Sequence, residues 1–265
     1  MIVLICTLEP FRIDWLPQFV AHYRGIGVQR FLLTLQLEPG AAPEAKEANR
    51  ERFRQALVRL NIHEPFFWEH EFDAPSVNDH ERRLQAESVA PTDWIVWCDS
   101  DEFQVYPEPL SALIAQSDAI GVDYFRGVLI DRIAADYGLA RFCPGQSIWD
   151  AYPRTCNVTQ ALAKGDPRKV TMTRGGVAVS GGKHTLDEGA NRRTIVGWAQ
   201  VHHFKWDASV IDRLQYRVRP EWKAKCWWWT ESQRLLDYFA AHGSRFDPAD
   251  LLPITLQGTH FLQVA

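Results

Sequence analysis

The sequence lacks the features that mark several specialised classes of protein. Its five cysteines form no CxxC pair, so a structural zinc site or a disulfide framework has no support, and a reducing compartment fits best. The net charge of −4 provides no basic surface, which argues against nucleic acid as the main partner. No run of eighteen apolar residues is present to span a membrane. The chain begins with apolar residues and no basic region, so we expect no signal peptide and a cytoplasmic location.

The amino-acid composition is that of an ordinary globular protein, apart from a high number of tryptophan residues. Of the 265 residues, 46% are apolar and 23% are charged, which is enough for a sizeable core. Length alone does not decide between one large α/β domain and a domain with an appendage. The excess is in tryptophan, with eleven residues. Tryptophan rings fill cores and also stack on sugars and bases, so both roles stay open for them.

Strand-like and helix-like segments alternate through the first part of the chain. This alternation is typical of βαβ units and a mostly parallel sheet. Pro65 indicates that the strand containing it is an edge strand or an irregular one. The predicted strands cover residues 2–6, 29–35, 62–68 and 94–98, and the predicted helices cover 13–23, 44–60 and 76–89.

The second part of the chain is less regular. The predicted elements are a short helix at 109–115, strands at 119–125, 170–180 and 194–204, and helices at 210–218 and 227–241. Residues 127–163 have the composition of a long, partly structured excursion. The pair Gly175-Gly176 predicts a turn inside the 170–180 segment.

The most informative stretch runs from Trp94 to Pro107. Its apolar residues 94–98 predict a strand buried on both faces, and the polar residues Asp99-Ser100-Asp101-Glu102 follow directly. In an open α/β sheet, ligands bind outside the carboxyl ends of the strands. Two carboxylates one residue apart can converge on a hard cation that prefers oxygen ligands. We therefore predict a site for Mg²⁺ or Mn²⁺ bridging a diphosphate.

Several further segments fall in a recognisable order along the chain. They are Glu9-Pro10 to Trp15-Leu16, His22-Tyr23, Gly25 to Phe31, Asp99 to Phe103, Gly127 to Arg132 and Val201 to Trp206. Together they resemble the family 2-like glycosyltransferases of the GT-A fold, and among them a bacterial DxDEF group related to family 92. The likeness extends to about residue 215.

The resemblance implies an α/β fold of GT-A type, with a mostly parallel, Rossmann-like sheet flanked by helices and a smaller acceptor-side half. It implies one domain, with residues 1–125 as the half that binds the nucleotide sugar and 126–265 as the half that binds the acceptor and completes the metal site. The implied reaction moves a sugar, with inversion, from a UDP- or GDP-type donor to a glycan or another hydroxyl acceptor. Peripheral association with a membrane stays open.

The resemblance also implies roles for particular residues. Asp99 and Asp101 match the family's DxD and would hold the donor and the metal, and His203, or second His184, would complete the metal site. The residues expected beside the donor are Thr7, Glu9, Arg83, Asp99 and Lys205. Two departures weaken the match: Leu84 replaces the asparagine of a common Arg-Asn pair, which leaves Arg82 as an alternative to Arg83, and Thr7-Leu8-Glu9 stands where Asn-Glu is common.

Glycosyl transfer needs a carboxylate to accept the proton of the acceptor hydroxyl. Asp131 is the candidate base, although an ion pair with Arg132 that holds the loop is the favoured explanation for it. The rival bases are Asp150, Asp187 and Glu188.

Structural roles compete with most of these assignments. Asp99 and Asp101 could cap the following loop, His203 could be a hydrogen-bonded histidine at a strand end, and Arg82 and Arg83 could form a solvated helix face.

Two other functions compete with sugar transfer. Phosphohydrolases of the haloacid dehalogenase type also place DxD after a buried strand, with the first aspartate as nucleophile. In those enzymes threonine or valine occupies the position of Phe103, and the motif follows the first strand of the sheet, whereas at least three predicted strands precede it here. A non-catalytic module that binds nucleotide sugars or glycans is the second alternative.

Overall fold

The computed structural model describes residues 1–187, 193–194, 199–224, 226, 228–252 and 254. These residues fall into two compact units. The first contains Met1–Gly127 and Lys169–Ala199, and the second contains Val128–Arg168 and Gln200–Gly258 as far as they are described. Within the described residues, no helix combines the length and apolarity needed to cross a membrane.

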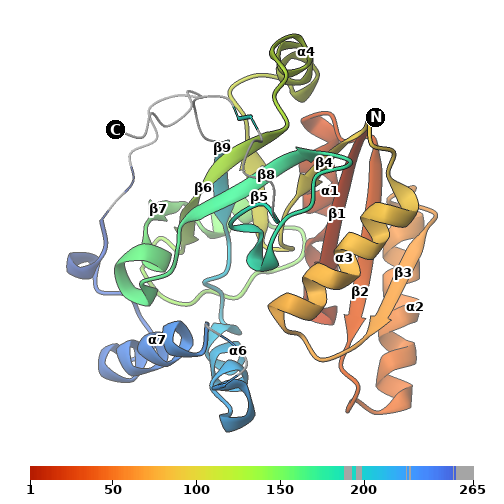
Figure 1. Cartoon of the computed structure of the whole chain (residues 1–265). Helices are drawn as coiled ribbons and strands as arrows, with labels where there is room; N and C mark the ends of the chain where they lie inside the picture. Colours follow the sequence, from red (N-terminus) through yellow and green to blue (C-terminus); the bar gives the residue numbers. More distant parts are fainter. Residues whose placement is uncertain (188–192, 195–198, 225, 227, 253, 255–265) are drawn as a thin grey trace. The chain divides into compact units, whose positions relative to one another are not determined.

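The first unit is built on an open sheet with strand order β3-β2-β1-β4-β8 (Figure 1). Strands β1, β2, β3 and β4 are mutually parallel, and β8 pairs with β4 in the antiparallel direction. The bounds are β1 Ile2–Leu8, β2 Arg30–Leu37, β3 Pro65–Glu69, β4 Trp94–Trp97 and β8 Arg168–Arg174. The α/β class with a mostly parallel sheet is therefore confirmed, and so is the edge position of β3.

The central strands are apolar because both of their faces are covered. Every residue of β1 and β4 is buried, as expected for parallel strands with helices on both sides. Trp97 in β4 is fully buried, and its Nε1 donates to Thr173 Oγ1 of β8 at 2.9 Å. The polar end of this large side chain thus has a partner, which buried tryptophan normally requires.

Helices connect and cover the strands of this unit. They are the 3-10 helix η1 Pro10–Trp15, followed by α1 Leu16–Gly25, α2 Pro43–Arg59, α3 Ala74–Ser88 and α4 Leu110–Ile120. The predicted apolar face of the first helix is buried throughout: Trp15, Leu16, Phe19, Val20 and Tyr23. The predicted start of the third helix at Ser76 is wrong, because Asp73 caps it by accepting a hydrogen bond from Ser76 N at 2.8 Å.

Two predicted boundaries in this region differ from the structure, and one strand was not predicted. Residues 119–123 do not form a strand, because α4 continues to Ile120 and ends at Gly121 with φ +70°; of the predicted 119–125 strand, only Tyr124 and Phe125 lie in a strand, as the start of β6. Glu102–Val105 forms strand β5, which was not predicted. Strand β8 ends at Arg174, and beyond the turn only Val179 makes an isolated bridge, to Leu186. Gly175 is required in this turn, since a Cβ there would lie 2.0 Å from the carbonyl oxygen of Ala90.

The second unit is partly β and partly helical. Its elements are β6 Tyr124–Ile133, which starts just before the unit, α5 Ile148–Ala151, β7 Arg154–Cys156, the short π-helix η2 Thr159–Ala163, β9 Ala199–His203, α6 Val210–Arg217, η4 Pro220–Trp222, α7 Trp228–His242 and η5 Pro248–Asp250. Strand β7 pairs antiparallel with β6. The predicted irregular excursion thus contains strands. The part of the predicted 194–204 strand at 195–198, and Trp227, lie outside the described residues.

Candidate functional site

The topology of the first unit indicates where a ligand would bind at the carboxyl ends of its parallel strands. After β1 the chain builds β2 and β3 on one side, and then returns with β4 on the other side of β1. Ligands bind at such a reversal, outside the carboxyl ends of the two diverging strands. Ile5 pairs with Trp97 in the β1–β4 register, so Thr7 and Asp99 follow side by side. The acidic turn therefore lies at the switch point of the sheet.

Five charged side chains lie together at the carboxyl ends of these strands, and we call them the charged cluster: Glu81, Asp99, Glu102, Lys169 and Lys183. Lys169 Nζ lies 3.0 Å from Asp99 Oδ2, 2.8 Å from Glu102 Oε1 and 2.9 Å from the carbonyl oxygen of Gly182. Its side chain is only 4% exposed and that of Glu102 1%. The three N–H donors of the ammonium thus have three acceptors.

Lys183 occupies the other side of the same carboxylate. Its Nζ lies 2.7 Å from Asp99 Oδ1 and 3.1 Å from Glu81 Oε2. The short helix η3 Gly181–Lys183 delivers this side chain, with φ of +72° at Gly182 and +59° at Lys183. A left-handed conformation at lysine costs roughly 1 kcal/mol or more and persists only where the surroundings fix it. Here the two carboxylates fix it.

Asp99 itself is the accessible member of the charged cluster, with 44% of its side chain exposed. Burial raises the pKa of Asp99, but the two lysines outweigh this effect, so its pKa lies well below the usual range. Burial lowers the pKa of Lys169 and of Lys183, but the neighbouring carboxylates outweigh it and raise both pKa values. At neutral pH the structure therefore presents an ionised Asp99 between two ammonium groups.

Glu81 and Thr7 complete this side of the site. Burial raises the pKa of the Glu81 carboxyl, although Lys183 counteracts the shift. Glu81 Oε1 accepts a hydrogen bond from Thr7 N at 3.1 Å. Thr7 Oγ1 is buried and has no hydrogen-bond partner among the described residues. A buried hydroxyl of this kind calls for an explanation, such as a ligand or water at the site.

Asp101 is held separately from the charged cluster. Its Oδ2 lies 3.0 Å from Arg12 Nη2, and the Arg12 side chain is fully buried. The guanidinium carbon lies 3.9 Å from the ring centroid of Trp15 and 5.0 Å from that of Phe11. Aromatic stacking of a guanidinium leaves its edge to bind a carboxylate. A small pocket beside this pair is lined by Cys6, Leu8, Arg12, Trp15, Leu16, Phe19 and Ser100.

The residues of the acidic turn do not fit a divalent cation. Both oxygens of Asp99 face ammonium groups, and Asp101 faces a guanidinium. Mg²⁺ and Mn²⁺ need several oxygen ligands, and fixed cations at the same oxygens oppose their binding. His184, at the end of η3, is half-buried. In the described part of the chain, it belongs with Asp99 and Asp101 to no group of three potential ligands that lie close together.

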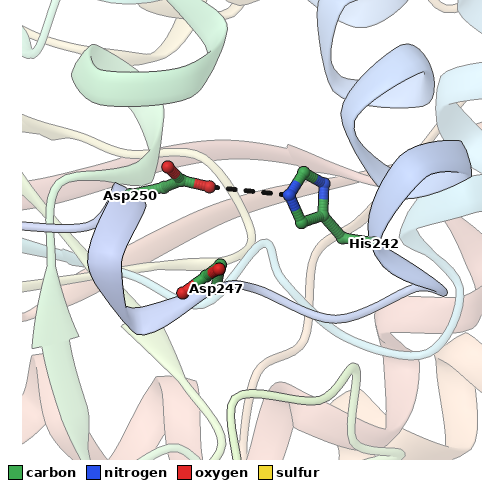
Figure 2. Close-up of side chains that lie close together, drawn as sticks. All are labelled: His242, Asp247 and Asp250. Atoms are coloured by element: carbon green, nitrogen blue, oxygen red, sulfur yellow. Dashed lines mark ion pairs between the residues drawn. The ribbon is translucent and has the colours of Figure 1, made fainter.

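Such a group does exist in the second unit, on its surface (Figure 2). His242 at the end of α7 lies near Asp247 and Asp250, with all three ligand atoms within 4.8 Å of one another. His242 Nε2 lies 3.7 Å from Asp250 Oδ2, and Nδ1 lies 2.8 Å from the carbonyl oxygen of Tyr238. All three residues are exposed, and exposed acidic groups are common without an ion. We assign no function to this group.

Asp131, the predicted base, is buried in the second unit, with 1% of its side chain exposed, and accepts several hydrogen bonds there. Its Oδ1 accepts from His203 Nδ1 at 2.9 Å, Trp206 Nε1 at 2.8 Å and Thr159 Oγ1 at 2.9 Å. Its Oδ2 accepts from Thr159 N at 2.6 Å. Because an ionised carboxylate only accepts, His203 Nδ1 must carry a proton here. Arg132 does not pair with Asp131, since its Nε donates to the carbonyl oxygen of Tyr152 at 2.9 Å.

The other residues singled out from the sequence lie as follows. Arg83 is exposed on α3, and Glu9 is half-buried after β1. Arg82 donates to the carbonyl oxygen of Val179 at 3.1 Å and pairs with Asp187. Lys205, in the second unit, lies with Nζ 5.1 Å from the ring centroid of Trp206. Asp150 is exposed, and Glu188 lies outside the described residues.

Sequence reasoning missed the basic half of the charged cluster. Lys169 directly precedes the predicted strand at 170–180, and Lys183 directly precedes His184. One signal was present for Glu81, because Val77, Glu81 and Leu84 have the spacing of one helix face, and all three are buried. A carboxylate on the apolar face of a helix becomes buried, and a buried charge is stable only when it is paired, so this spacing predicts a cation nearby.

No protein-family model matches the chain, and no curated protein matches it. Among solved structures, S. aureus TarS is similar over 94% of this chain and 44% of its own, at 10% identity and a TM-score of 0.36. A structure of TarS 1-349 matches 66% of this chain and 47% of its own, at 10% identity and a TM-score of 0.31. UDP-glucose pyrophosphorylase complexed with UDP-glucose matches over 93% and 89%, at 10% identity and a TM-score of 0.28. The chain spans less than half of either TarS structure, and likenesses at this level carry no argument about activity.

Proposed function

We propose that the protein is a glycosyltransferase that moves a sugar from a nucleotide-diphosphate donor to a hydroxyl acceptor. The observation that carries the proposal is Asp99, a partly exposed carboxylate at the switch point of the sheet, kept ionised by two buried lysines. Such a carboxylate accepts hydrogen bonds from ribose or sugar hydroxyl groups in a fixed geometry. The likeness of the acidic turn to the DxDEF glycosyltransferases supports the same assignment.

The proposed reaction places demands on the site. Negative charge develops on the leaving diphosphate, and fixed positive charges stabilise it. A carboxylate base accepts the proton of the acceptor hydroxyl. The predicted base, Asp131, already accepts four hydrogen bonds inside the second unit, so we leave this role open among the carboxylates of the chain.

A panel of UDP-, GDP- and dTDP-sugars tests the proposal by thermal shift and nucleotide release. We expect one donor to stabilise the protein and to release its nucleotide when an acceptor is supplied. Asp99→Asn removes a charged acceptor, which is worth about 1.5–3 kcal/mol, so the Kd of that donor should rise roughly 10- to 150-fold. Asp79→Asn, on the exposed side of α3, is the matched control and should bind as the wild type does.

The same panel separates the alternatives. Stabilisation without turnover by any acceptor would indicate a binding module. Release of phosphate from a monoester would indicate a phosphohydrolase. If no donor shifts the melting temperature, or if Asp99→Asn binds the donor unchanged, the proposal is wrong.

A further inference from the structure

We propose that the acidic turn takes its counter-ions from Lys169, Lys183 and Arg12, and that it binds its donor without a divalent metal ion. The identity of the ligand rests on the function proposed above. The absence of a metal requirement rests on the geometry of the turn alone. It departs from the metal site that the DxD pattern predicts.

The first step of the argument is that the carboxylate oxygens already have cationic partners. Asp99 Oδ1 and Oδ2 lie 2.7 and 3.0 Å from two different ammonium nitrogens. These are distances of charge-assisted hydrogen bonds. A divalent ion bound to either oxygen would lie next to a fixed positive charge, and like charges at this separation repel each other.

The second step is that the lysines cannot easily leave. Lys169 has an acceptor for each of its three N–H groups, and its departure would leave the buried Glu102 without a counter-ion. Lys183 is fixed by its left-handed backbone and by Glu81, which is also buried. A metal ion at Asp99 would therefore have to displace two ion pairs made by buried lysines before it gained its own ligands.

The third step concerns the second aspartate. Asp101 Oδ2 binds Arg12, whose guanidinium stacks on Trp15 and is fully buried. Burial and stacking on Trp15 hold the guanidinium in place beside this carboxylate. The two carboxylates that would bracket a metal are thus each committed to cations of the chain.

The lysines also supply what a metal supplies to a diphosphate. Lys183 has three N–H donors and two carboxylate partners, Asp99 and Glu81. Its ammonium contacts three carboxylate oxygens, Asp99 Oδ1 at 2.7 Å and Glu81 Oε2 and Oε1 at 3.1 and 3.4 Å, and we place the diphosphate of the donor near this ammonium. In this arrangement a fixed ammonium offsets the charge that develops on the leaving diphosphate.

Titration of the full-length protein with Mn²⁺ alone, followed by electron paramagnetic resonance, tests the proposal without any donor. We expect no bound Mn²⁺ that depends on Asp99. His242, Asp247 and Asp250 could hold an ion independently, so the titration is repeated with His242→Gln. Mn²⁺ that remains bound in His242→Gln and is lost in Asp99→Asn would overturn the proposal.

A variant gives the complementary result. Lys183→Met leaves Asp99 and Glu81 without their shared ammonium, and we expect the folded variant to gain Mn²⁺ binding that Lys183→Met/Asp99→Asn loses again. If the folded variant gains none, the lysine is not what excludes the metal and the proposal fails. If circular dichroism shows that it does not fold, the wild-type titration decides alone.

Donor binding gives the third readout. The Kd of the nucleotide sugar selected by the panel should agree within twofold in EDTA and in Mn²⁺, as measured by calorimetry. A tenfold tightening by Mn²⁺ that disappears in Asp99→Asn would contradict the proposal. If no nucleotide sugar binds under either condition, the proposed function fails, while the Mn²⁺ titration still decides whether the turn binds metal.

Discussion

Replacing Lys169 by methionine should lower the free energy of unfolding by about 3–5 kcal/mol, because it leaves a buried carboxylate without its counter-ion. Glu102 is 1% exposed and Lys169 4%, and their charged atoms lie 2.8 Å apart. Methionine fills a similar volume, so the loss is electrostatic rather than a cavity. Urea denaturation followed by circular dichroism measures the change.

Two variants serve as controls for this prediction. In Lys169→Met/Glu102→Gln the uncompensated charge is removed, so the double variant should recover part of the lost stability, since contacting residues couple by about 0.5–3 kcal/mol. Lys46→Met breaks the more exposed ion pair with Glu69 and should cost at most about 1 kcal/mol. A loss below 1 kcal/mol in Lys169→Met would show that the charged cluster does not stabilise the first unit.

Replacing Asp131 by alanine should lower the free energy of unfolding of the second unit by a similar amount. It removes the acceptor of four donors, of which His203 Nδ1 and Trp206 Nε1 are buried and Thr159 N and Oγ1 are partly buried. Each unsatisfied buried donor costs about 1–3 kcal/mol, so we expect a loss of roughly 3–5 kcal/mol after partial relaxation. Denaturant unfolding monitored by tryptophan fluorescence measures it.

The rival base Asp150 provides the comparison. It is exposed, and Asp150→Ala should change the free energy of unfolding by no more than about 0.5 kcal/mol. The opposite pattern, an Asp131→Ala variant of wild-type stability that has lost transferase activity, would restore Asp131 to the role of base and contradict its description as a structural centre.

The elements of the first unit could be predicted from the sequence because their signals are local. The apolar run before Asp99 predicts a buried strand, and the spacing of Trp15, Phe19 and Tyr23 predicts a buried helix face; both are confirmed. The strand predicted at 119–125 began too early, at 119 instead of Tyr124, because apolar residues continue across the helix end at Gly121. A short apolar run does not distinguish a buried strand from the end of a buried helix.

The charged cluster could be predicted only in part. The acidic turn has a local signature, and its place at the end of β4 follows from the order of elements. Its lysines come from positions 70 and 84 residues away in the chain, so no spacing rule connects them with Asp99. Arg12 lies 89 residues from Asp101 and sits among aromatic residues that predict only a core. Their pairing became visible only in the folded chain.

A crystal structure of the full-length protein soaked in EDTA with the selected nucleotide sugar is the most direct test of the site. We expect the donor over the carboxyl ends of β1 and β4, with a hydroxyl group hydrogen-bonded to Asp99 and both lysines still in contact with that carboxylate. A donor bound elsewhere, or Asp99 turned away from Lys169 and Lys183 when the donor is bound, would contradict the account.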